Sequence, residues 1–307
     1  MTADRFGAAA TSFRALQGRI VDALQQADPS ARFVRDAWQR SDPVAADGAG
    51  SPRVTGGGVT CIVEGGALLE RGGVGFTEIE GQLGPDVPAA MPGEGMHFRA
   101  TGVSLVLHPR NPHVPIVHMN YRRIERGARG WFGGGTDLTP CYLHAEDARH
   151  FHGTLREVCD RHGAVAPYPT LKRDCDAYFD LPHRGERRGI GGIFFDLLDS
   201  GDDRDFAFVR DAGAAFLPAW LPLATRRQDT PYGPNEVAWQ QLRRGRHVEF
   251  NLLWDRGTTF GLKTGGRIES ILLSMPPQAA WRYDYEPAAD SAEAALLEVL
   301  RLPRDWT

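Results

Sequence analysis

The sequence predicts an α+β fold, with a large, mostly antiparallel β-sheet flanked by α-helices. Segments with strand patterning follow one another in runs, and the helical segments cluster between those runs. A parallel doubly wound sheet would instead alternate strand and helix regularly. The 307 residues show no internal repeat and fit one large domain. We therefore expect a single domain over residues 1–307.

Composition excludes several classes of protein. Hydrophobic residues make up 42% and charged residues 24%, which is typical of globular chains. A net charge of −4 argues against a non-specific nucleic-acid binder. No apolar run approaches the roughly 20 residues that cross a bilayer, so we expect no membrane span. The segment Met1–Ala10 lacks the apolar centre of a signal peptide, which predicts a cytoplasmic protein.

The N-terminal half is predicted to be rich in strands. Helical spacing predicts a helix over Ser12–Gln26, and the Gly, Ala, Asp and Pro content of Asp42–Gly58 indicates a flexible connection. A Gly-rich loop is expected at Gly130–Pro140. Strands are predicted at Val59–Val63, Gly73–Ile79, His97–His108 and Val114–Arg122.

The C-terminal half mixes both kinds of element. Apolar residues at helical spacing predict helices at His144–His162, Leu171–Leu181, Phe206–Leu217, Asn235–Arg243 and Ala292–Leu300. Short apolar or alternating runs predict strands at Gly191–Leu197, Arg246–Trp254, Arg267–Ser274 and Trp281–Tyr285.

The most informative stretch for function is Ser104–Arg122. Side chains of a strand alternate between faces, and if the apolar faces of both strands pack on helices, their apolar residues share one face. A hydroxyl, two imidazoles, an amide and a guanidinium then converge on the other. Solvent-facing residues of a wet sheet would give the same pattern, but His and Asn are uncommon strand-surface residues, which favours a site. The residues are Ser104, His108, His118, Asn120 and Arg122.

Glycine-rich segments carry further candidates. Asp137 follows Gly133–Gly135 and could act as a base or accept N–H donors, although a turn-forming Asp would look the same. Arg188 lies in a run that is either an anion-binding loop or a solvated charge cluster. Gly265 and Gly266 before Arg267 form either a carboxylate cradle or a hairpin turn.

Cofactor signals are sparse. The four cysteines lack CxxC spacing and are expected to be reduced thiols, and no glycine motif for a nucleotide is present. Together with the glycine loops, Arg122, Arg188, Arg256 and Arg267 suit a flat substrate that bears several carboxylates. Four histidines could supply either a metal site or a proton relay, namely His108, His118, His152 and His183.

Long motifs make a resemblance specific. The chain resembles the oxygen-dependent coproporphyrinogen-III oxidases of haem biosynthesis from about Arg32 to Trp306. The motifs that carry the resemblance are HPRNPHVPIVHMNYR, WFGGGTDLTPCY, EDARHFH, HRGERRGIGGIFFD, GRHVEFNLLWDRGT and FGLKTGGRIESILLSMPP.

The resemblance implies a reaction. Members of the family oxidatively decarboxylate two propionates of coproporphyrinogen III to vinyl groups, giving protoporphyrinogen IX. Molecular oxygen accepts the electrons, no organic cofactor is used, and CO2 and hydrogen peroxide leave. The family fold has its active site in a cleft on the sheet. Members of the family form homodimers, and the resemblance places the dimer interface of this chain at His247–Arg282.

The resemblance also implies roles for residues. His118 matches the proposed proton donor. Positions that match divalent-metal ligands of bacterial members are His108, His118, His152 and His183. Positions that match substrate binding are Ser104, Asn120, Tyr121, Arg122, Gly265, Gly266 and Arg267, and those that match groups holding pyrroles or propionates are Asp137, Arg188, Asp255 and Arg256.

These assignments lead to a hypothesis of mechanism. Asp137 or Asp255 would bind or deprotonate pyrrole N–H groups, with a pKa raised by burial in the cleft. Arg122 and Arg267 would hold propionates. His118 would move a proton, and any metal would be structural or auxiliary.

Two other functions fit parts of the pattern. A non-haem metal oxygenase would use the histidines, but its two-His, one-carboxylate spacing is absent around His108 and His118. A non-catalytic tetrapyrrole carrier would need the Arg and Gly cradle, but not Asp137 and His118.

Overall fold

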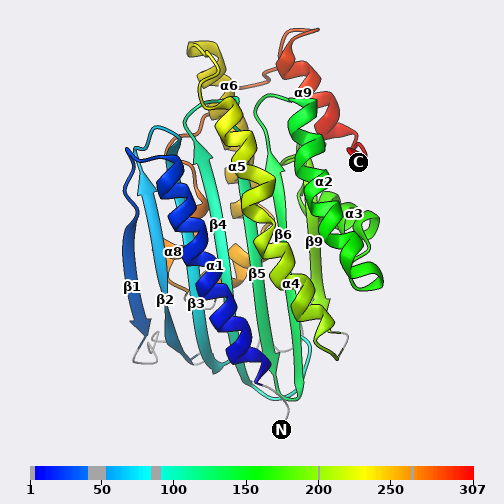
Figure 1. Cartoon of the computed structure of the whole chain (residues 1–307). Helices are drawn as coiled ribbons and strands as arrows, with labels where there is room; N and C mark the ends of the chain where they lie inside the picture. The colour runs from blue at the N-terminus through cyan, green and yellow to red at the C-terminus, as the bar shows by residue number, and fades with distance from the viewer. Residues whose placement is uncertain (1–3, 41–52, 84–90, 200, 264–265) are drawn as a thin grey trace.

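A computed structural model describes residues 4–40, 53–83, 91–199, 201–263 and 266–307 (Figure 1). A seven-stranded sheet in the order β1-β2-β3-β4-β5-β6-β9 forms its centre, and every neighbouring pair of strands is antiparallel. The predicted fold class is therefore confirmed. The strands are β1 Val34–Arg40, β2 Arg53–Glu64, β3 Leu69–Gln82, β4 His97–Pro109, β5 Ile116–Arg126, β6 Arg129–Thr139 and β9 Gly191–Leu198.

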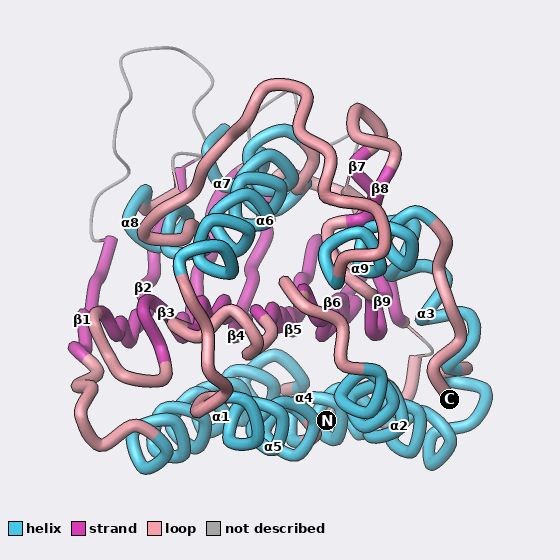
Figure 2. The backbone as a smooth tube through the Cα atoms, turned by 90° about the horizontal axis from the view of Figure 1, so that it is seen from above, coloured by secondary structure: helices cyan, strands magenta, loops and turns pink. Residues whose placement is uncertain are grey.

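Helices cover both faces of the sheet (Figure 2). One layer contains α1 Arg5–Ala27, α2 Ala145–His162, α4 Arg204–Ala214 and α5 Phe216–Arg227. The other contains α6 Pro234–Leu253, α7 Arg256–Lys263, α8 Ile268–Ile271 with η3 Leu272–Ser274, and α9 Ala292–Arg301, beside the small hairpin β7 Asp180–Leu181 and β8 Glu186–Arg187. After η2 Gly163–Val165, α3 Tyr168–Tyr178 packs against β9.

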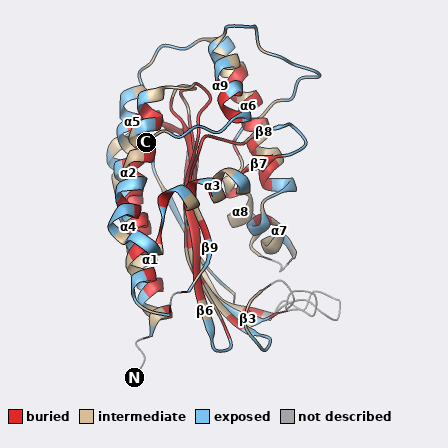
Figure 3. Cartoon of the chain, turned by 90° about the vertical axis from the view of Figure 1, so that its right-hand side faces the viewer, coloured by how far each residue is buried: buried red, intermediate tan, exposed pale blue. Residues whose placement is uncertain are grey.

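The main core lies between the sheet and the first helical layer. Helix α1 buries Phe13, Leu16, Ile20 and Leu24 at helical spacing, and the Asp4 side chain caps its N-terminus. From the sheet, alternate residues of β4 and β5 enter the same core. Figure 3 shows buried residues concentrated along the sheet and the inner sides of the helices.

The opposite face of the sheet carries the polar residues, and we call it the site face. Strand register places Ser104 opposite Asn120, His118 opposite Asp137, and Arg122 opposite Gly133. Because paired residues project from the same face, these side chains form one surface across β4, β5 and β6. The prediction that the polar positions coincide is confirmed for these strands.

The predicted Gly-rich loop at Gly130–Pro140 is wrong. The segment is the interior strand β6, paired with β5 and β9. Glycine normally weakens a strand, but here it makes room for neighbours: a Cβ on Gly133 would lie 2.8 Å from the Arg122 guanidinium.

The predicted connection Asp42–Gly58 is also partly wrong. Residues 53–58 begin β2, where Gly58 accommodates the Trp38 ring and leaves no space for a Cβ. The remainder of that prediction, residues 42–52, lies outside the described residues.

Three predicted C-terminal strands are wrong as well. Arg246–Trp254 continues helix α6 to Leu253, Arg267–Ser274 forms α8 and η3, and Trp281–Tyr285 has no regular structure. In the second half of α6 the buried side includes the polar residues His247 and Asn251, which hides its helical period in the sequence.

The remaining helix predictions are confirmed with shifted boundaries. The predicted helix Phe206–Leu217 is two helices, because α4 ends at Ala214 and α5 begins at Phe216. No described helix combines the length and apolar character that a bilayer-spanning segment needs.

Candidate active site

A buried ion-pair network lies at the centre of the site face. His118 Nδ1 lies 2.7 Å from Asp137 Oδ1, and an Arg188 NH group donates to Asp137 Oδ2 at 2.7 Å. The Asp137 side chain is 2% exposed, whereas that of His118 is 22% exposed. The carboxylate therefore fixes the imidazole from the protein side and directs Nε2 away from Asp137.

The expected rise in the Asp137 pKa is wrong. Burial raises the pKa of this carboxyl, but the neighbouring Arg188 cation and the hydrogen bond from His118 outweigh burial and lower it. Asp137 is thus a carboxylate whose two oxygens both accept hydrogen bonds from protein groups. Such a group suits orientation of His118 better than proton abstraction.

Arg188 supports this network from below the surface. Its side chain is 1% exposed, and its guanidinium lies over the rings of Phe179 and Phe250 at 4.1 and 4.7 Å. The resemblance implied that Arg188 is one of the groups that hold pyrroles or propionates. In the structure its buried guanidinium pairs with Asp137.

A second charged cluster lies beside the first. An Arg122 NH group donates to Asp196 Oδ1 at 2.8 Å, and another donates to Asn120 Oδ1 at 3.2 Å. Arg256 reaches the second oxygen of Asp196 at 3.6 Å. Arg122 is 30% exposed and Arg256 65%, so both cations face solvent.

Asp255 lies at the start of α7 and has structural partners. It accepts hydrogen bonds from the Tyr178 hydroxyl at 2.8 Å and from the Thr258 N–H at 2.7 Å. Burial raises its pKa, but the Thr258 and Tyr178 hydrogen bonds outweigh burial and lower it. The expected rise in pKa is wrong here also. The Tyr178 ring stacks on Phe194 at 4.2 Å and lies under Arg256.

Between these clusters the site face carries little side-chain bulk. Ser104 is exposed, and a Cβ on Gly75, its pairing partner, would meet only a backbone oxygen at 3.8 Å. Gly133 and Gly135 lie on the same face of β6. The surface beside Arg122 and His118 is therefore low enough for a flat molecule to approach the strands.

The α8–η3 segment packs on the site face as well, but over strands β1, β3 and β4. Arg267 pairs with Asp36 of β1 at 2.5 Å, and Leu273 fills the space above Gly73. Asp36 lies four strands from Arg122, about 19 Å at the usual strand spacing. Gly266 bonds to Gly261 within the turn before α8, and Gly265 lies outside the described residues.

Tyr121 does not share the site face. Its side chain is fully buried towards the helices, where its hydroxyl bonds Thr136 at 2.8 Å and its ring stacks on Phe195. Period-two alternation places it opposite to Asn120 and Arg122, so the Tyr121 side chain cannot contact a molecule on the site face.

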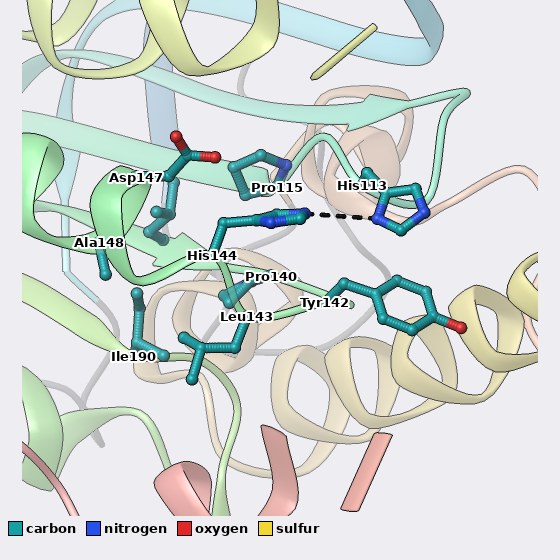
Figure 4. Close-up of a pocket in the computed structure, with 10 residues that line it drawn as sticks. His113, Pro115, Pro140, Tyr142, Leu143, His144, Asp147, Ala148 and Ile190 are labelled. Carbon is teal, nitrogen blue, oxygen red and sulfur yellow. Dashed lines mark hydrogen bonds between the residues drawn. The ribbon is translucent and has the colours of Figure 1, made fainter. Parts of the chain in front are cut away.

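A small pocket lies away from all of these residues, at the N-terminal end of α2 (Figure 4). None of the predicted site residues lines it; its walls are His113, Pro115, Leu138, Pro140, Tyr142, Leu143, His144, Asp147, Ala148 and Ile190. The candidate active site is therefore the cluster of charged side chains on the site face.

The family model for coproporphyrinogen III oxidase matches residues 8–306. The chain belongs to this family. It is also similar to a human protein named oxygen-dependent coproporphyrinogen-III oxidase, mitochondrial, with 47% identity over 306 residues. That match covers 94% of the chain and 64% of the human protein, so the chain spans less than two thirds of its relative's length.

The histidines that match metal positions in this family do not come together. His152 lies on α2, across the sheet from His118, where it bonds the Tyr168 hydroxyl at 2.8 Å. His183 bonds Glu249 at 2.7 Å and accepts from Trp254. The described residues contain no group of three or more His, Cys, Asp or Glu placed to hold a metal ion. The four histidines therefore do not fit one metal site.

The remaining histidine of that set, His108, has a different partner. Its Nε2 lies 2.9 Å from the Ser274 carbonyl oxygen, and His247 Nε2 lies 3.2 Å from the same oxygen. Both rings are fully buried, and burial lowers both pKa values, that of His108 to about 3. Both imidazoles are thus neutral donors that hold η3 against the sheet.

Sequence reasoning missed three residues of the site. Asp196, Tyr178 and Phe194 all contact the arginines or the carboxylates described above. The motif HRGERRGIGGIFFD contains Phe194 and Asp196 and was the available signal. Tyr178 ends a helix whose contacts are visible only in the fold.

Proposed function

We propose that this chain catalyses the oxygen-dependent decarboxylation of two propionates of coproporphyrinogen III, giving protoporphyrinogen IX. The observation that supports this most directly is the pair of exposed guanidiniums, Arg122 and Arg256, on a low glycine-lined face beside the His118–Asp137 pair. Cations fixed next to an oriented imidazole suit a flat polycarboxylate on which a proton must also move.

Each of the two oxidative decarboxylations balances in atoms and electrons without an organic cofactor. A propionate carboxylate leaves as CO2, and its β-carbon loses a hydride equivalent, which creates the vinyl group. Oxygen takes that hydride together with one proton and becomes hydrogen peroxide. The protein must therefore bind the carboxylate, orient the β-carbon and manage a proton.

The residues divide these tasks. Arg122 and Arg256 bind and orient the propionates, and His118 moves a proton at Nε2. Asp137 keeps the opposite nitrogen of His118 hydrogen-bonded, which holds the ring in one orientation. Ser104 and Asn120 face the pyrrole rings, and Arg267 with Gly266 approaches a more distant propionate.

A divalent metal, if bound, is structural or auxiliary in this proposal. Exhaustive chelation should leave decarboxylation in place. Loss of activity that only a redox-active ion restores would contradict this and would favour a non-haem oxygenase instead.

The test is incubation with coproporphyrinogen III with and without oxygen, followed by chromatography of the oxidised porphyrins. We expect loss of two carboxylates only when oxygen is present, with stoichiometric peroxide. Tight binding without decarboxylation in either condition would identify a tetrapyrrole carrier and overturn the catalytic roles.

We also propose a homodimer formed through His247–Arg282. Large apolar side chains are unusually exposed along this segment, which is typical of an interface. They include Leu252, Leu253, Trp254, Leu262, Ile268 and Trp281. The partner that fits is a second copy of this chain, because the family resemblance places dimerisation here.

Analytical ultracentrifugation tests the dimer. Leu253→Glu introduces a charge at a side chain that is 61% exposed, and we expect it to produce monomers. Leu302→Glu changes a similarly exposed residue outside the segment and serves as the control. A dimer that survives Leu253→Glu and related substitutions along the segment would place the interface elsewhere.

We propose that the chain acts in the cytoplasm. The described cysteines, Cys61, Cys141, Cys159 and Cys175, are all free thiols, as expected in a reducing compartment. Fractionation of cells that produce the protein tests this, and recovery in an organelle or an extracytoplasmic fraction would contradict it.

A further inference from the structure

Asp196 contacts both exposed arginines of the site. Its Oδ1 accepts from Arg122 at 2.8 Å, and its Oδ2 lies 3.6 Å from Arg256. Arg122 comes from strand β5 of the sheet, whereas Arg256 begins helix α7 in the helical layer that covers the site face. One carboxylate thus links two cations from distant parts of the chain.

The backbone around Asp196 is built irregularly. Pairing between β6 and β9 shifts here: Phe132 pairs with Leu198, but Gly134 pairs with Phe195. Two residues of β9, Asp196 and Leu197, therefore lie opposite one residue of β6, which is a bulge. Bulges redirect side chains, and this one turns the Asp196 carboxylate towards Arg122.

The bulge also carries strain. Leu197 has a φ of 55°, a conformation that costs free energy for a residue with a side chain. Its own N–H donates to Asp196 Oδ1 at 3.1 Å. The strained backbone therefore bonds directly to the carboxylate that it positions.

The facing strand leaves space for the same pair. A Cβ on Gly133 would lie 2.7 Å from Asp196 Oδ1 and 2.8 Å from the Arg122 guanidinium. Real Cβ atoms do not approach that closely, so only glycine permits the observed ion pair without displacement. Three local features thus serve one contact: the bulge, the positive φ and a bare position.

We propose that Asp196 is a positioning residue that holds Arg122 and Arg256 together as one two-cation clamp for a substrate propionate. The inference rests on the proposed function and deepens it. Two guanidiniums repel each other, and a shared carboxylate lets them converge. Each guanidinium has five N–H donors, and the contacts of Arg122 with Asn120 and Asp196 use two of them. Donors remain for a bidentate carboxylate.

The test compares Asp196→Asn with the unaltered protein. The probes are the oxidised product coproporphyrin III, followed by its fluorescence, and its tetramethyl ester, which has the same ring but no carboxylates. We expect the dissociation constant for coproporphyrin III and the KM for coproporphyrinogen III to rise about tenfold or more. Binding of the ester should not change, because the clamp recognises carboxylates.

A second variant acts without removing charge. Gly133→Ala places a methyl group against the Arg122–Asp196 pair, so it should weaken coproporphyrin III binding in the same way. Asp199→Asn is the matched control: Asp199 pairs with Arg129 at 3.2 Å just beyond the same strand and should leave binding unchanged. Circular dichroism confirms that each variant is folded.

The outcomes separate the two proposals. If the unaltered protein decarboxylates coproporphyrinogen III but folded Asp196→Asn binds coproporphyrin III equally well or more tightly, the clamp is overturned and the proposed function stands. Equal losses for the acid and the ester would show a general structural role and would also overturn it. If the unaltered protein neither binds nor decarboxylates, both proposals fall.

Discussion

His118 illustrates how one residue divides its two nitrogens between structure and chemistry. Nδ1 bonds the buried Asp137 carboxylate, and the ring remains partly exposed on the site face. The sequence predicted this residue as the proton donor, and the geometry leaves Nε2 for that task. The tautomer follows from the partner, because a carboxylate requires a proton on the nitrogen that it faces.

We expect His118→Gln to lower kcat/KM about 10²- to 10⁴-fold, the usual contribution of a positioned acid or base. The substitution keeps a hydrogen-bonding group beside Asp137, so the melting temperature should change little. Steady-state kinetics and calorimetry measure both. Activity within threefold of the unaltered protein would exclude His118 from proton transfer.

Asp137→Asn should act on stability as well as activity. It leaves the buried Arg188 guanidinium without a counter-charge, and breaking a buried pair in this way costs about 3–5 kcal/mol. Urea unfolding measures the loss. The double variant Asp137→Asn with Arg188→Met should recover part of it, and a single variant as stable as the unaltered protein would contradict the pairing.

For individual residues, the face of the sheet on which a side chain lies could be predicted from the sequence, but the partner of a charged side chain could not. The period of two placed His118, Asn120 and Arg122 on one face, as the register confirms. Pairing of Arg188 with Asp137, 51 residues apart, depends on where the segment between β8 and β9 packs, whereas the resemblance implied substrate contacts for both residues. Asp196 was missed because its direction depends on a bulge.

Several contacts hold the α8–η3 segment to the sheet, and two of them share one carbonyl oxygen. His108 and His247 both bond Ser274 O, and Leu273 occupies the space above Gly73. These contacts fix the part of the chain that carries Arg267. His108, which the resemblance matches to a metal position, therefore anchors the backbone of η3 in this structure.

His247→Phe should loosen this segment locally. It removes one of two donors to Ser274 O and should cost about 0.5–1.5 kcal/mol, because His108 still bonds the oxygen. Hydrogen exchange should rise at residues 268–275. His150→Phe removes a similar imidazole-to-carbonyl bond, to Pro218 in the other layer, and should leave exchange at 268–275 unchanged.

Unchanged exchange at residues 268–275 in His247→Phe would contradict a role of the His247–Ser274 bond in holding the segment.

Elements with a clear apolar period were predictable, and those with a polar or glycine pattern were not. Helix α2 and strands β4 and β9 match their predictions closely. Strand β6 contains consecutive glycines, a pattern that predicts a loop. In the fold these glycines make room for neighbouring side chains such as Arg122. The second half of α6 was predicted as a strand because its buried side includes polar residues, His247 and Asn251, beside Phe250, which hides the apolar helical period.

The molecule as a whole buries neutral histidines on both sides of its sheet. Burial lowers the pKa of His108 and His152 to about 3, and that of His247 falls well below its ordinary value. In the unfolded chain the same groups titrate near pH 6.5. Between these values the unfolded state binds more protons, so stability falls as pH falls below about 6.5.

We expect the free energy of unfolding to drop between pH 7.5 and 5.5 by about 1.4 kcal/mol for each of the three histidines. Urea unfolding at the two pH values measures the drop. His152→Phe should remove about one third of it. A stability that does not change over this interval would mean that these rings are protonated in the folded protein.

The fold class could be predicted from the whole chain because strands come in runs, and runs favour antiparallel neighbours. The sheet order follows from this for β1 to β6, which are consecutive. The addition of β9 at the edge, after two helices, could not be predicted, although it supplies Asp196. Family motifs named most site residues but not their contacts.

The two faces of the sheet imply a distinctive mutational pattern. Along β4, β5 and β6, odd and even positions serve different purposes: one set packs against helices and the other faces the proposed substrate. Saturation mutagenesis read out separately for abundance and for turnover should therefore produce stripes two residues apart, out of phase with each other. Adaptation of the chemistry could then proceed on one set of positions while the other keeps the protein folded.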